Sequence, residues 1–255
     1  MRLAIFSDIH GNPYACEAVL GAIAREGSFD AILAAGDLCL GGSDPAACID
    51  QLASAGVQGV YGNTEQYLRS PEQTPPDELH RSIWDIVQPA ACWTLDRLTE
   101  AERGWLFGLP FERQLSPTGK PGDELLVVHA NPKDVELMIY PAEMEQRRLW
   151  GEVRQPDTAN ELREAMSGVA AGVIAFGHFH YMFERHWGDK TLVDVACCSL
   201  PGIDHDLRAR YTIFEWVKNK WVFSQRRVEY EAQREVEALQ ASDLPSKAHF
   251  LSYFD

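Results

Sequence analysis

The chain has no long hydrophobic run. Its first apolar segment, residues 3–6, stops at Ser7, whereas the apolar core of a secretion signal is roughly 7–15 residues long. No stretch approaches the roughly 18 consecutive apolar residues that span a bilayer. We therefore expect a cytoplasmic protein with no membrane association, and a β-strand at residues 3–6.

The sequence also lacks C-x-x-C cysteine motifs and has few positively charged residues. The 6 cysteines show no C-x-x-C spacing, which fits a reducing compartment. Lys and Arg number 23 against 38 Asp and Glu, so the formal net charge is -15. This deficit disfavours a nucleic acid polymer as partner, and a nuclease activity, because phosphate backbones are held by clustered Lys and Arg. Small phosphoesters remain compatible substrates, since bound cations reverse the field locally.

The composition is that of a globular chain with a large core. Of its 255 residues, 45% are hydrophobic and 24% are charged, which favours a single domain over residues 1–255. Residues 66–122 carry no metal-ligand motif and begin with several prolines, so we expect a helical cap or insertion there. Its helices should cover residues 78–88 and start again at Thr99, which opens a capping box.

An insertion of this kind is a natural place for substrate selection. The candidate contacts in it are Tyr67, Arg69, His80, Arg81 and Trp84. Each of these side chains could equally belong to an ordinary amphipathic helix that covers a sheet. The segment at residues 131–168 has the same two alternatives: its helices either line the other rim of the substrate pocket or serve only as scaffold.

Metal-ligand residue types gather in short islands along the sequence. They are Asp8-Ile9-His10, Gly36-Asp37, Gly62-Asn63, His129 and Gly177-His178-Phe179-His180. Carboxylate, imidazole and amide-oxygen donors in one site suit a pair of divalent cations that share a carboxylate. In the first and last islands the ligands are two residues apart, so in an extended chain both would project to the same side.

Each island follows an apolar run that indicates a buried strand. The runs are residues 3–6, 31–34, 57–61, 125–128 and 173–176. Ligands beyond the carboxyl ends of strands match the usual location of sites in open α/β sheets. Between the first three strands we expect helices that start at Pro13, with Asn12 as N-cap, and at Pro45, capped by Ser43 or Asp44. Two later hairpins, at residues 182–196 and 210–230, should complete a second sheet.

The ordered set of motifs resembles the calcineurin-like metallophosphoesterase superfamily, whose pattern is D-x-H, GD, GN, H and GH-x-H. The resemblance covers roughly residues 1–200 and, more narrowly, is to small bacterial and archaeal phosphoesterases of the YfcE and MJ types. It implies an α/β fold, a four-layer α-β-β-α sandwich of two mixed sheets with a helical insertion. The two hairpins expected from the strand pattern agree with such a sandwich.

The resemblance also implies a role for each ligand residue. One metal ion would be bound by Asp8, His10 and His180, and the other by Asn63, His129 and His178, with Asp37 as the bridge. Of these, Asp37, Asn63 and His129 are also the expected catalytic residues. In the family the two ions hold a phosphate oxygen and lower the pKa of a bridging water, so that hydroxide attacks phosphorus in line. Manganese is the expected metal, with Fe, Ni, Zn and Mg as alternatives.

One position departs from the family pattern. Thr64 follows Asn63 where many members carry a histidine that protonates or stabilises the leaving oxygen. General acid catalysis typically contributes about 10²- to 10⁴-fold, so the poor leaving groups of simple monoesters should suffer most. Either Glu65 partly replaces the histidine by means of a raised pKa, or Thr64 merely packs and water supplies the proton.

The expected function is a dinuclear metal-dependent phosphodiesterase that acts on a small or nucleotide-like phosphoester. A phosphomonoesterase of the same fold is one alternative. Another is a non-catalytic interaction scaffold, since a retromer subunit resembles this fold, although here every ligand position is filled. The aromatic tail at residues 250–254 would either make a homodimer contact or pack on the body of the protein.

Overall fold

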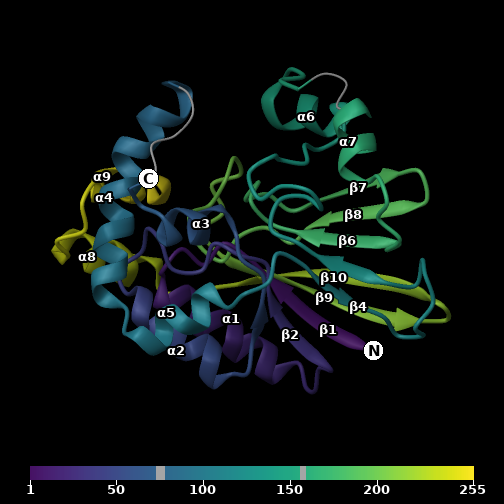
Figure 1. Ribbon diagram of the computed structural model, residues 1–255, viewed down its shortest axis with the longest axis horizontal. Helices are drawn as coiled ribbons and strands as arrows, with labels where there is room; N and C mark the ends of the chain where they lie inside the picture. The colour runs from purple at the N-terminus through teal and green to yellow at the C-terminus, as the bar shows by residue number, and fades with distance from the viewer. Residues whose placement is uncertain (73–77, 156–158) are drawn as a thin grey trace.

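Two mixed sheets form the centre of the computed structural model, which describes residues 1–72, 78–155 and 159–255 (Figure 1). The first, ordered β10-β9-β1-β2-β3, contains β1 (Arg2–Phe6), β2 (Ala31–Ala34), β3 (Gln58–Gly59), β9 (Ala209–Val217) and β10 (Lys220–Val228). The second, ordered β4-β5-β6-β8-β7, contains β4 (Arg113–Leu115), β5 (Leu125–Val127), β6 (Val173–Phe176), β7 (Phe183–Trp187) and β8 (Lys190–Asp194). Each sheet combines parallel and antiparallel pairs, which confirms the expected mixed sheets.

The central strands bury both of their faces. In β1, Leu3 and Ile5 pack between the two sheets, whereas Ala4 and Phe6 face the helices outside the first sheet. In β5, Val127 joins the layer between the sheets and its neighbour Leu126 faces outward. Successive side chains of a strand point to opposite faces. Strands buried on both faces therefore need continuous apolar runs, which explains the pattern seen in the sequence.

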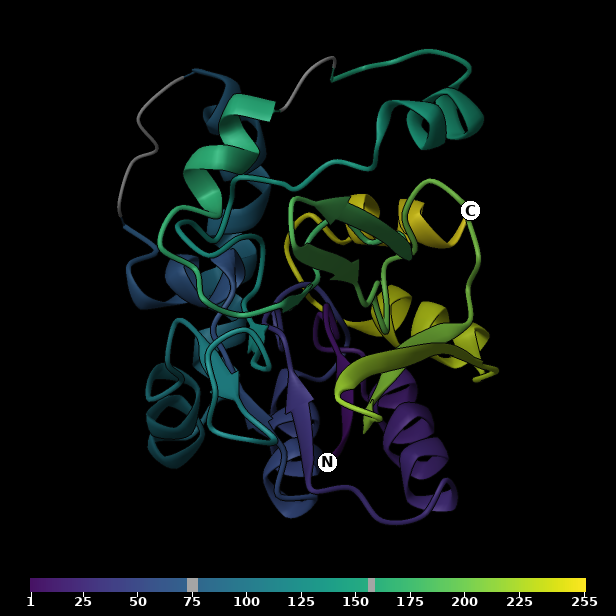
Figure 2. The ribbon, with the colours of Figure 1, turned by 90° about the vertical axis from the view of Figure 1, so that its right-hand side faces the viewer.

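Helices cover the outer faces of both sheets. Those around the first sheet are α1 (Pro13–Arg25), α2 (Pro45–Ser54), α3 (Asn63–Arg69), α4 (Glu78–Arg97), α5 (Glu100–Phe107), α8 (Ala232–Ala241), α9 (Lys247–Leu251) and the 3-10 helix η1 (Ser252–Phe254). Over the second sheet lie α6 (Glu143–Trp150) and α7 (Ala159–Ala165). Figures 1 and 2 show α6 and α7 at the top of the molecule and α1 and α2 at the bottom. The four-layer α-β-β-α sandwich is therefore confirmed.

The helices that return the chain to β2 and β3 begin at the expected residues. Asn12 Oδ1 accepts a hydrogen bond from the Ala15 amide at 3.0 Å, and Pro13 occupies the first turn of α1. Asp44 Oδ1 accepts one from the Ala47 amide at 3.0 Å and so caps α2. Each cap satisfies an amide that has no partner within the helix and contributes about 1 kcal/mol. The parallel neighbours β1, β2 and β3 follow from these two connections.

The expectation that both late hairpins complete the second sheet is wrong. The β7-β8 hairpin does join the second sheet, through β6. The β9-β10 hairpin instead joins the first sheet, where Phe214 of β9 pairs with Leu3 of β1. Phe214 is fully buried in the layer between the sheets. The pairing of β9 with β1 buries this apolar side chain, and burial of that kind is favourable. Strand patterns alone cannot resolve such a pairing.

The helix expected over residues 78–88 is also longer than the sequence indicates. Helix α4 runs through Pro89 to Arg97. Proline removes one backbone hydrogen bond from a helix interior. Here Ala90, Ala91 and Trp93 directly after it are buried in the core beside the first sheet, and their burial offsets that cost.

The segment over residues 66–122 supplies α4 and α5 to the outer layer and β4 to the second sheet. Its standing as a separate cap remains a prediction. In the aromatic tail, Phe250 is buried and the side chains around it pack on the helical core, while the homodimer remains a prediction. Within the described residues, no helix combines the length and the apolar character needed to cross a membrane.

Candidate metal centre

The structure brings the seven predicted ligand residues together just beyond the carboxyl ends of β1, β2, β3, β5 and β6. The donor atoms of Asp8, His10 and His180 form one group, and those of Asp37, His129 and His178 another, each within 4.8 Å. Asn63, at the start of α3, adjoins the second group, since its Oδ1 lies 2.8 Å from His129 Nε2. The grouping matches the one that the family resemblance implies.

The backbone at the ligand residues is not extended. Five of them have positive φ: Asp8 at 54°, His10 at 50°, Asp37 at 55°, His178 at 68° and His180 at 59°. The D-x-H and H-x-H pairs therefore converge through left-handed turns, and the explanation from extended strand geometry is wrong. Two loops support each other in these turns, because the Asp8 amide donates to Gly36 O and the His10 amide donates to Asp37 O, both at 3.0 Å. Left-handed backbone is costly for residues other than glycine.

The four histidines of the centre are all oriented by a hydrogen bond to a backbone carbonyl. One ring nitrogen of each bonds a backbone carbonyl: His10 Nδ1 to Leu40 O at 2.9 Å, His129 Nδ1 to Ala35 O at 2.8 Å, His178 Nε2 to Glu136 O at 3.0 Å and His180 Nδ1 to Leu200 O at 2.6 Å. Because a carbonyl can only accept, the bonded nitrogen carries the proton in the neutral ring. The other nitrogen then offers its lone pair to the centre, as metal-bound histidines do.

Asp8 has a buried carboxylate oxygen without a hydrogen-bond donor among the described residues. Its Oδ2 accepts the His178 amide at 3.0 Å. Its Oδ1 is buried and, among the described residues, no hydrogen-bond donor is aligned with it, although His180 Nε2 lies 3.2 Å away. Burial alone would raise the pKa of Asp8, but the positive charge of the surrounding imidazoles when they are protonated, above all that of His180, holds this pKa well below its usual range. A buried, ionised oxygen without a donor is a fitting ligand for a cation.

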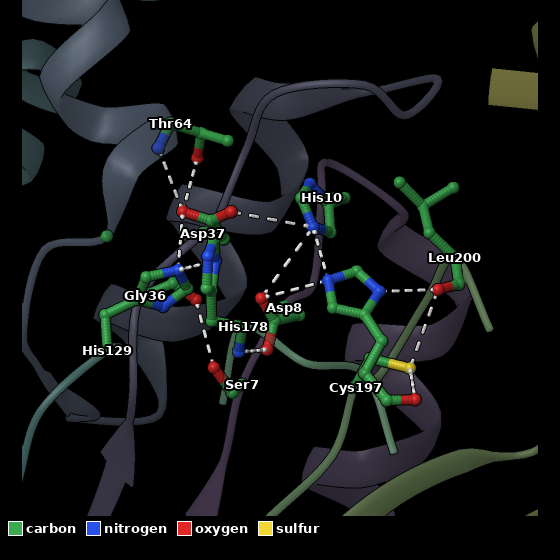
Figure 3. A network of polar contacts seen from close by, with 12 residues as sticks. Ser7, Asp8, His10, Gly36, Asp37, Thr64, His129, His178, Cys197 and Leu200 are labelled. Carbon is green, nitrogen blue, oxygen red and sulfur yellow. Dashed lines mark hydrogen bonds and ion pairs between the residues drawn. The ribbon is translucent and has the colours of Figure 1, made fainter. Parts of the chain in front are cut away.

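Asp37 faces both groups of ligands. Its Oδ1 lies 3.4 Å from His129 Nε2, and its Oδ2 lies 3.8 Å from His10 Nε2. The amide and the hydroxyl of Thr64 both donate to Oδ1, each at 3.0 Å (Figure 3). These bonds fix the carboxylate between the two groups, the position in which one carboxylate can serve two ions.

Glu65 and Thr64 support the metal centre through hydrogen bonds to its loops, a role that the sequence analysis did not predict. Glu65 is fully buried and accepts hydrogen bonds from the amides of Asp37, Leu38 and Gly62 at 2.7–2.9 Å. Burial, helped by the nearby charge of Asp37, raises the pKa of Glu65 to about 7. The raised pKa was anticipated, but both oxygens point at backbone amides. The signal that could have revealed this support is the spacing of Gly62 and Glu65, because a glutamate three residues after the N-cap can accept the N-cap amide, as Glu65 does here at 2.7 Å.

A buried arginine supports the last ligand, and it too was missed. Arg210 of β9 is fully buried, and its guanidinium pairs with Asp204 at 2.7 Å and donates to the carbonyl of His180 at 3.4 Å. Breaking a buried pair of this kind leaves an uncompensated charge. Arg210 therefore ties the His180 loop to the first sheet.

The candidate substrate contacts predicted in residues 66–122 are mostly engaged in packing. Tyr67 donates its hydroxyl to Glu136 Oε1 at 3.0 Å and meets the edge of Trp84. Arg69 lies over the Tyr61 ring and donates to a backbone carbonyl. The side chains of His80 and Arg81 lie outside the described part of the chain.

Taken together, the donors fit a pair of divalent cations. Four oriented imidazoles, two carboxylates and one amide oxygen make the mixed set that Mn²⁺, Fe²⁺ and Zn²⁺ accept. The backbone is also shaped around them: Gly36 has φ of 92°, and a side chain there would place its first carbon 2.7 Å from His129 Nδ1.

Comparison with known proteins identifies the fold and the motifs. A family model for calcineurin-like phosphoesterases matches residues 1–182. The chain belongs to this family. Its members are metal-dependent phosphoesterases, so the expected family is confirmed.

Individual relatives are distant from this chain. The uncharacterized protein MJ0912 of Methanocaldococcus jannaschii is 28% identical over 138 residues, which are 54% of this chain and 53% of the relative. The chain thus aligns with about half the length of that curated relative. A metallophosphoesterase from Sphaerobacter thermophilus has a similar structure, with a TM-score of 0.71, 22% identity and coverage of 100% and 99% of the two chains. The hypothetical protein PH1004 from Pyrococcus horikoshii has a TM-score of 0.72, 17% identity and coverage of 99% and 97%. The two structures show a shared fold.

Proposed function

We propose that this phosphoesterase is a dinuclear enzyme that hydrolyses small phosphodiesters. The observation that carries the proposal is the placement of Asp37, whose two oxygens face the two groups of ligands at 3.4 and 3.8 Å. Asp8, His10 and His180 would hold one ion, and His129, His178 and Asn63 the other. Manganese is the metal we propose, with Fe²⁺, Ni²⁺, Zn²⁺ and Mg²⁺ as alternatives that the same mixture of oxygen and imidazole donors accepts.

The chain itself contributes position and charge. Two divalent cations would supply positive charge for a phosphoryl oxygen and would lower the pKa of a water molecule. The two carboxylates neutralise only part of four positive charges, so the loaded site attracts an anionic phosphoester although the whole chain carries -15. The carbonyls of residues 35, 40, 136 and 200 hold the imidazoles ready, which lowers the reorganisation needed during reaction.

The preference for diesters rests on the two residues that follow Asn63. Thr64 is only 5% exposed, and its hydroxyl is directed toward Asp37, to which it donates a hydrogen bond. Glu65 is fully buried against three backbone amides. Neither side chain is placed to protonate a leaving alkoxide. Without that acid, worth about 10²- to 10⁴-fold, poor leaving groups are disfavoured most.

The test compares leaving groups and ester types on one protein. We expect Mn²⁺-loaded enzyme to hydrolyse bis-p-nitrophenyl phosphate with higher kcat/KM than p-nitrophenyl phosphate, and simple alkyl monoesters least of all. Higher turnover of alkyl monoesters than of diesters would replace the proposal with the phosphomonoesterase alternative. No turnover of any ester with Mn²⁺, Fe²⁺, Ni²⁺, Zn²⁺ or Mg²⁺ would favour the interaction scaffold.

A substitution tests the role of the missing acid. Thr64→His should raise the monoester-to-diester ratio of kcat/KM by about 10-fold or more if an acid at this position limits monoesters. Because Thr64 also supports Asp37, both rates will fall, and only their ratio within one variant is informative. Thr64→Ser, which keeps the hydroxyl, is the matched control and should leave the ratio unchanged. A histidine variant that gains nothing on monoesters would count against this explanation.

A further inference from the structure

A pocket of about 440 Å³ lies beside the half of the centre that contains Asn63. The residues that line it are Tyr61, Gln66, Phe111, Lys133, Asp134, Val135 and Glu136. Its volume falls within the range of about 300–1,000 Å³ that is usual for small-molecule sites.

The pocket and the metal centre are built from the same chain segments. Tyr61 and Gln66 flank Asn63 in the chain, and Gln66 lies one helical turn after it on α3. On the opposite wall, the carbonyl of Glu136 accepts the hydrogen bond from His178 Nε2 at 3.0 Å. Two of the second group's ligands, Asn63 and His178, are therefore held by segments that also line the pocket. A substituent of a phosphoester bound at the centre has this pocket as its neighbour.

The lining combines two aromatic rings with hydrogen-bond acceptors. The rings of Tyr61 and Phe111 lie 5.9 Å apart at 59° to each other, and Phe111 is only half-buried. Such aromatic surfaces stack against nucleobases. Asp134 and Glu136 add carboxylates, the group that binds sugar hydroxyls in nucleotide sites. Asp134 Oδ1 also accepts the amides of Glu136 and Leu137, and Glu136 Oε1 accepts the Tyr67 hydroxyl.

Charge decides which part of a substrate fits. Two carboxylates, Asp134 and Glu136, face one ammonium, Lys133, so the lining has an excess of negative charge. A second phosphate or a polyphosphate chain would be repelled there. A neutral group that carries hydroxyls and a planar ring is accepted by the same lining.

We infer that this pocket binds the nucleoside of a nucleotide phosphodiester, with the base against Phe111 and the sugar hydroxyl toward the carboxylates. The inference rests on the proposed phosphodiesterase function and names its substrate class. The diester phosphate would lie at the metal centre, and the second alcohol would be the leaving group.

The kinetic test uses two diesters with the same leaving group. Thymidine 5′-(p-nitrophenyl phosphate) and methyl p-nitrophenyl phosphate differ only in the group assigned to the pocket. The wild-type enzyme should show a KM at least about tenfold lower for the nucleoside ester, the size expected of one base stacked on an aromatic ring. Phe111→Ala should remove that advantage and leave kcat/KM for the methyl ester within about twofold of wild type.

The matched control is Phe254→Ala, which removes another half-buried phenyl ring, from η1. It should leave the KM ratio of the two esters as in the wild type. If Phe111→Ala slows both esters equally, or if the wild-type enzyme does not distinguish them, the pocket does not bind a nucleoside. That result would leave the phosphodiesterase proposal intact.

A binding measurement separates the pocket from catalysis. Titration of the metal-free protein with thymidine, followed by NMR, should give a dissociation constant that Phe111→Ala raises about tenfold and Phe254→Ala leaves unchanged. If both diesters resist hydrolysis while thymidine still binds in this way, the proposed function fails and the pocket stands. An absence of Phe111-dependent binding would overturn the inference, whatever the kinetics.

Discussion

Asp37 is the residue whose replacement should affect both halves of the metal centre at once. Its two oxygens lie 3.4 Å from His129 Nε2 and 3.8 Å from His10 Nε2. Asp37→Asn keeps the shape of the side chain but removes its charge, and the donated bonds from Thr64 can still reach its amide oxygen. We therefore expect both ions to bind more weakly and kcat/KM to fall sharply.

The expected magnitude follows from the charge that is lost. A carboxylate and a divalent ion about 4 Å apart attract each other by about 8 kcal/mol at an effective dielectric constant near 20. If desolvation offsets three quarters of this energy, about 2 kcal/mol per ion remains, which is roughly a 30-fold loss in affinity for each ion. The drop in kcat/KM at limiting Mn²⁺ should then be at least about 10³-fold, because both ions must be present together.

Asp8→Asn is the matched comparison, because Asp8 belongs to only one group of ligands. Isothermal titration with Mn²⁺, with the bound metal then counted by mass spectrometry, should find one weakened site in Asp8→Asn. The same assay should find two weakened sites in Asp37→Asn. An Asp37→Asn protein that binds two ions with wild-type affinity and keeps full turnover would refute the assignment of Asp37 as the bridge.

Three further predictions concern stability. Chelation of two ions that are each present at 100 times their Kd should lower the free energy of unfolding by about 5 kcal/mol and the Tm by roughly 10–20 °C in calorimetry; an unchanged Tm would mean that no ion is bound. Gly36→Ala should destabilise the protein by about 2–4 kcal/mol in urea titrations, because its new carbon would meet His129 at 2.7 Å; a neutral effect would contradict the tight contact. Burial raises the pKa of Glu235 to about 7, so ionisation costs stability as the pH rises from about 4.5 to 7, by up to about 3 kcal/mol; Glu235→Gln should flatten this part of the stability profile, and an unchanged profile would refute the shift.

The location of the site could be predicted because it depends on strands that the sequence marks clearly. Runs such as residues 3–6 and 173–176 are apolar throughout and end at ligand residues. A strand buried on both faces needs such a run, and the carboxyl ends of parallel neighbours meet at one edge of a sheet. The family resemblance then divided the ligands into the two groups that the structure brings together.

The parts that could not be predicted depend on contacts between distant segments. Glu65 binds the Leu38 amide 27 residues away, and Arg210 reaches the His180 carbonyl across 30 residues. Neither contact has a periodic signature. The pairing of β9 with β1 is of the same kind, because Leu3 and Phe214 lie far apart in the sequence and meet only in the packed core. Residue types alone show that Thr64 is not histidine, but only the fold shows that its hydroxyl turns toward Asp37.

The left-handed backbone at the ligand residues helps to distinguish a metal centre with a chemical role from the non-catalytic interaction scaffold. Of the eleven non-glycine residues with positive φ among those described, five are ligand residues. At about 1 kcal/mol or more each, their cost is on the order of 5 kcal/mol, comparable with the entire stability of many domains. Such strain persists only where surrounding contacts over-determine it, and it concentrates at functional sites. A scaffold that bound partners through its outer surface would gain nothing from these turns, nor from a buried Asp8 oxygen without an aligned donor. Bound cations would account for both features, since they would interact with the side chains that the turns bring together and supply the charge that this oxygen lacks.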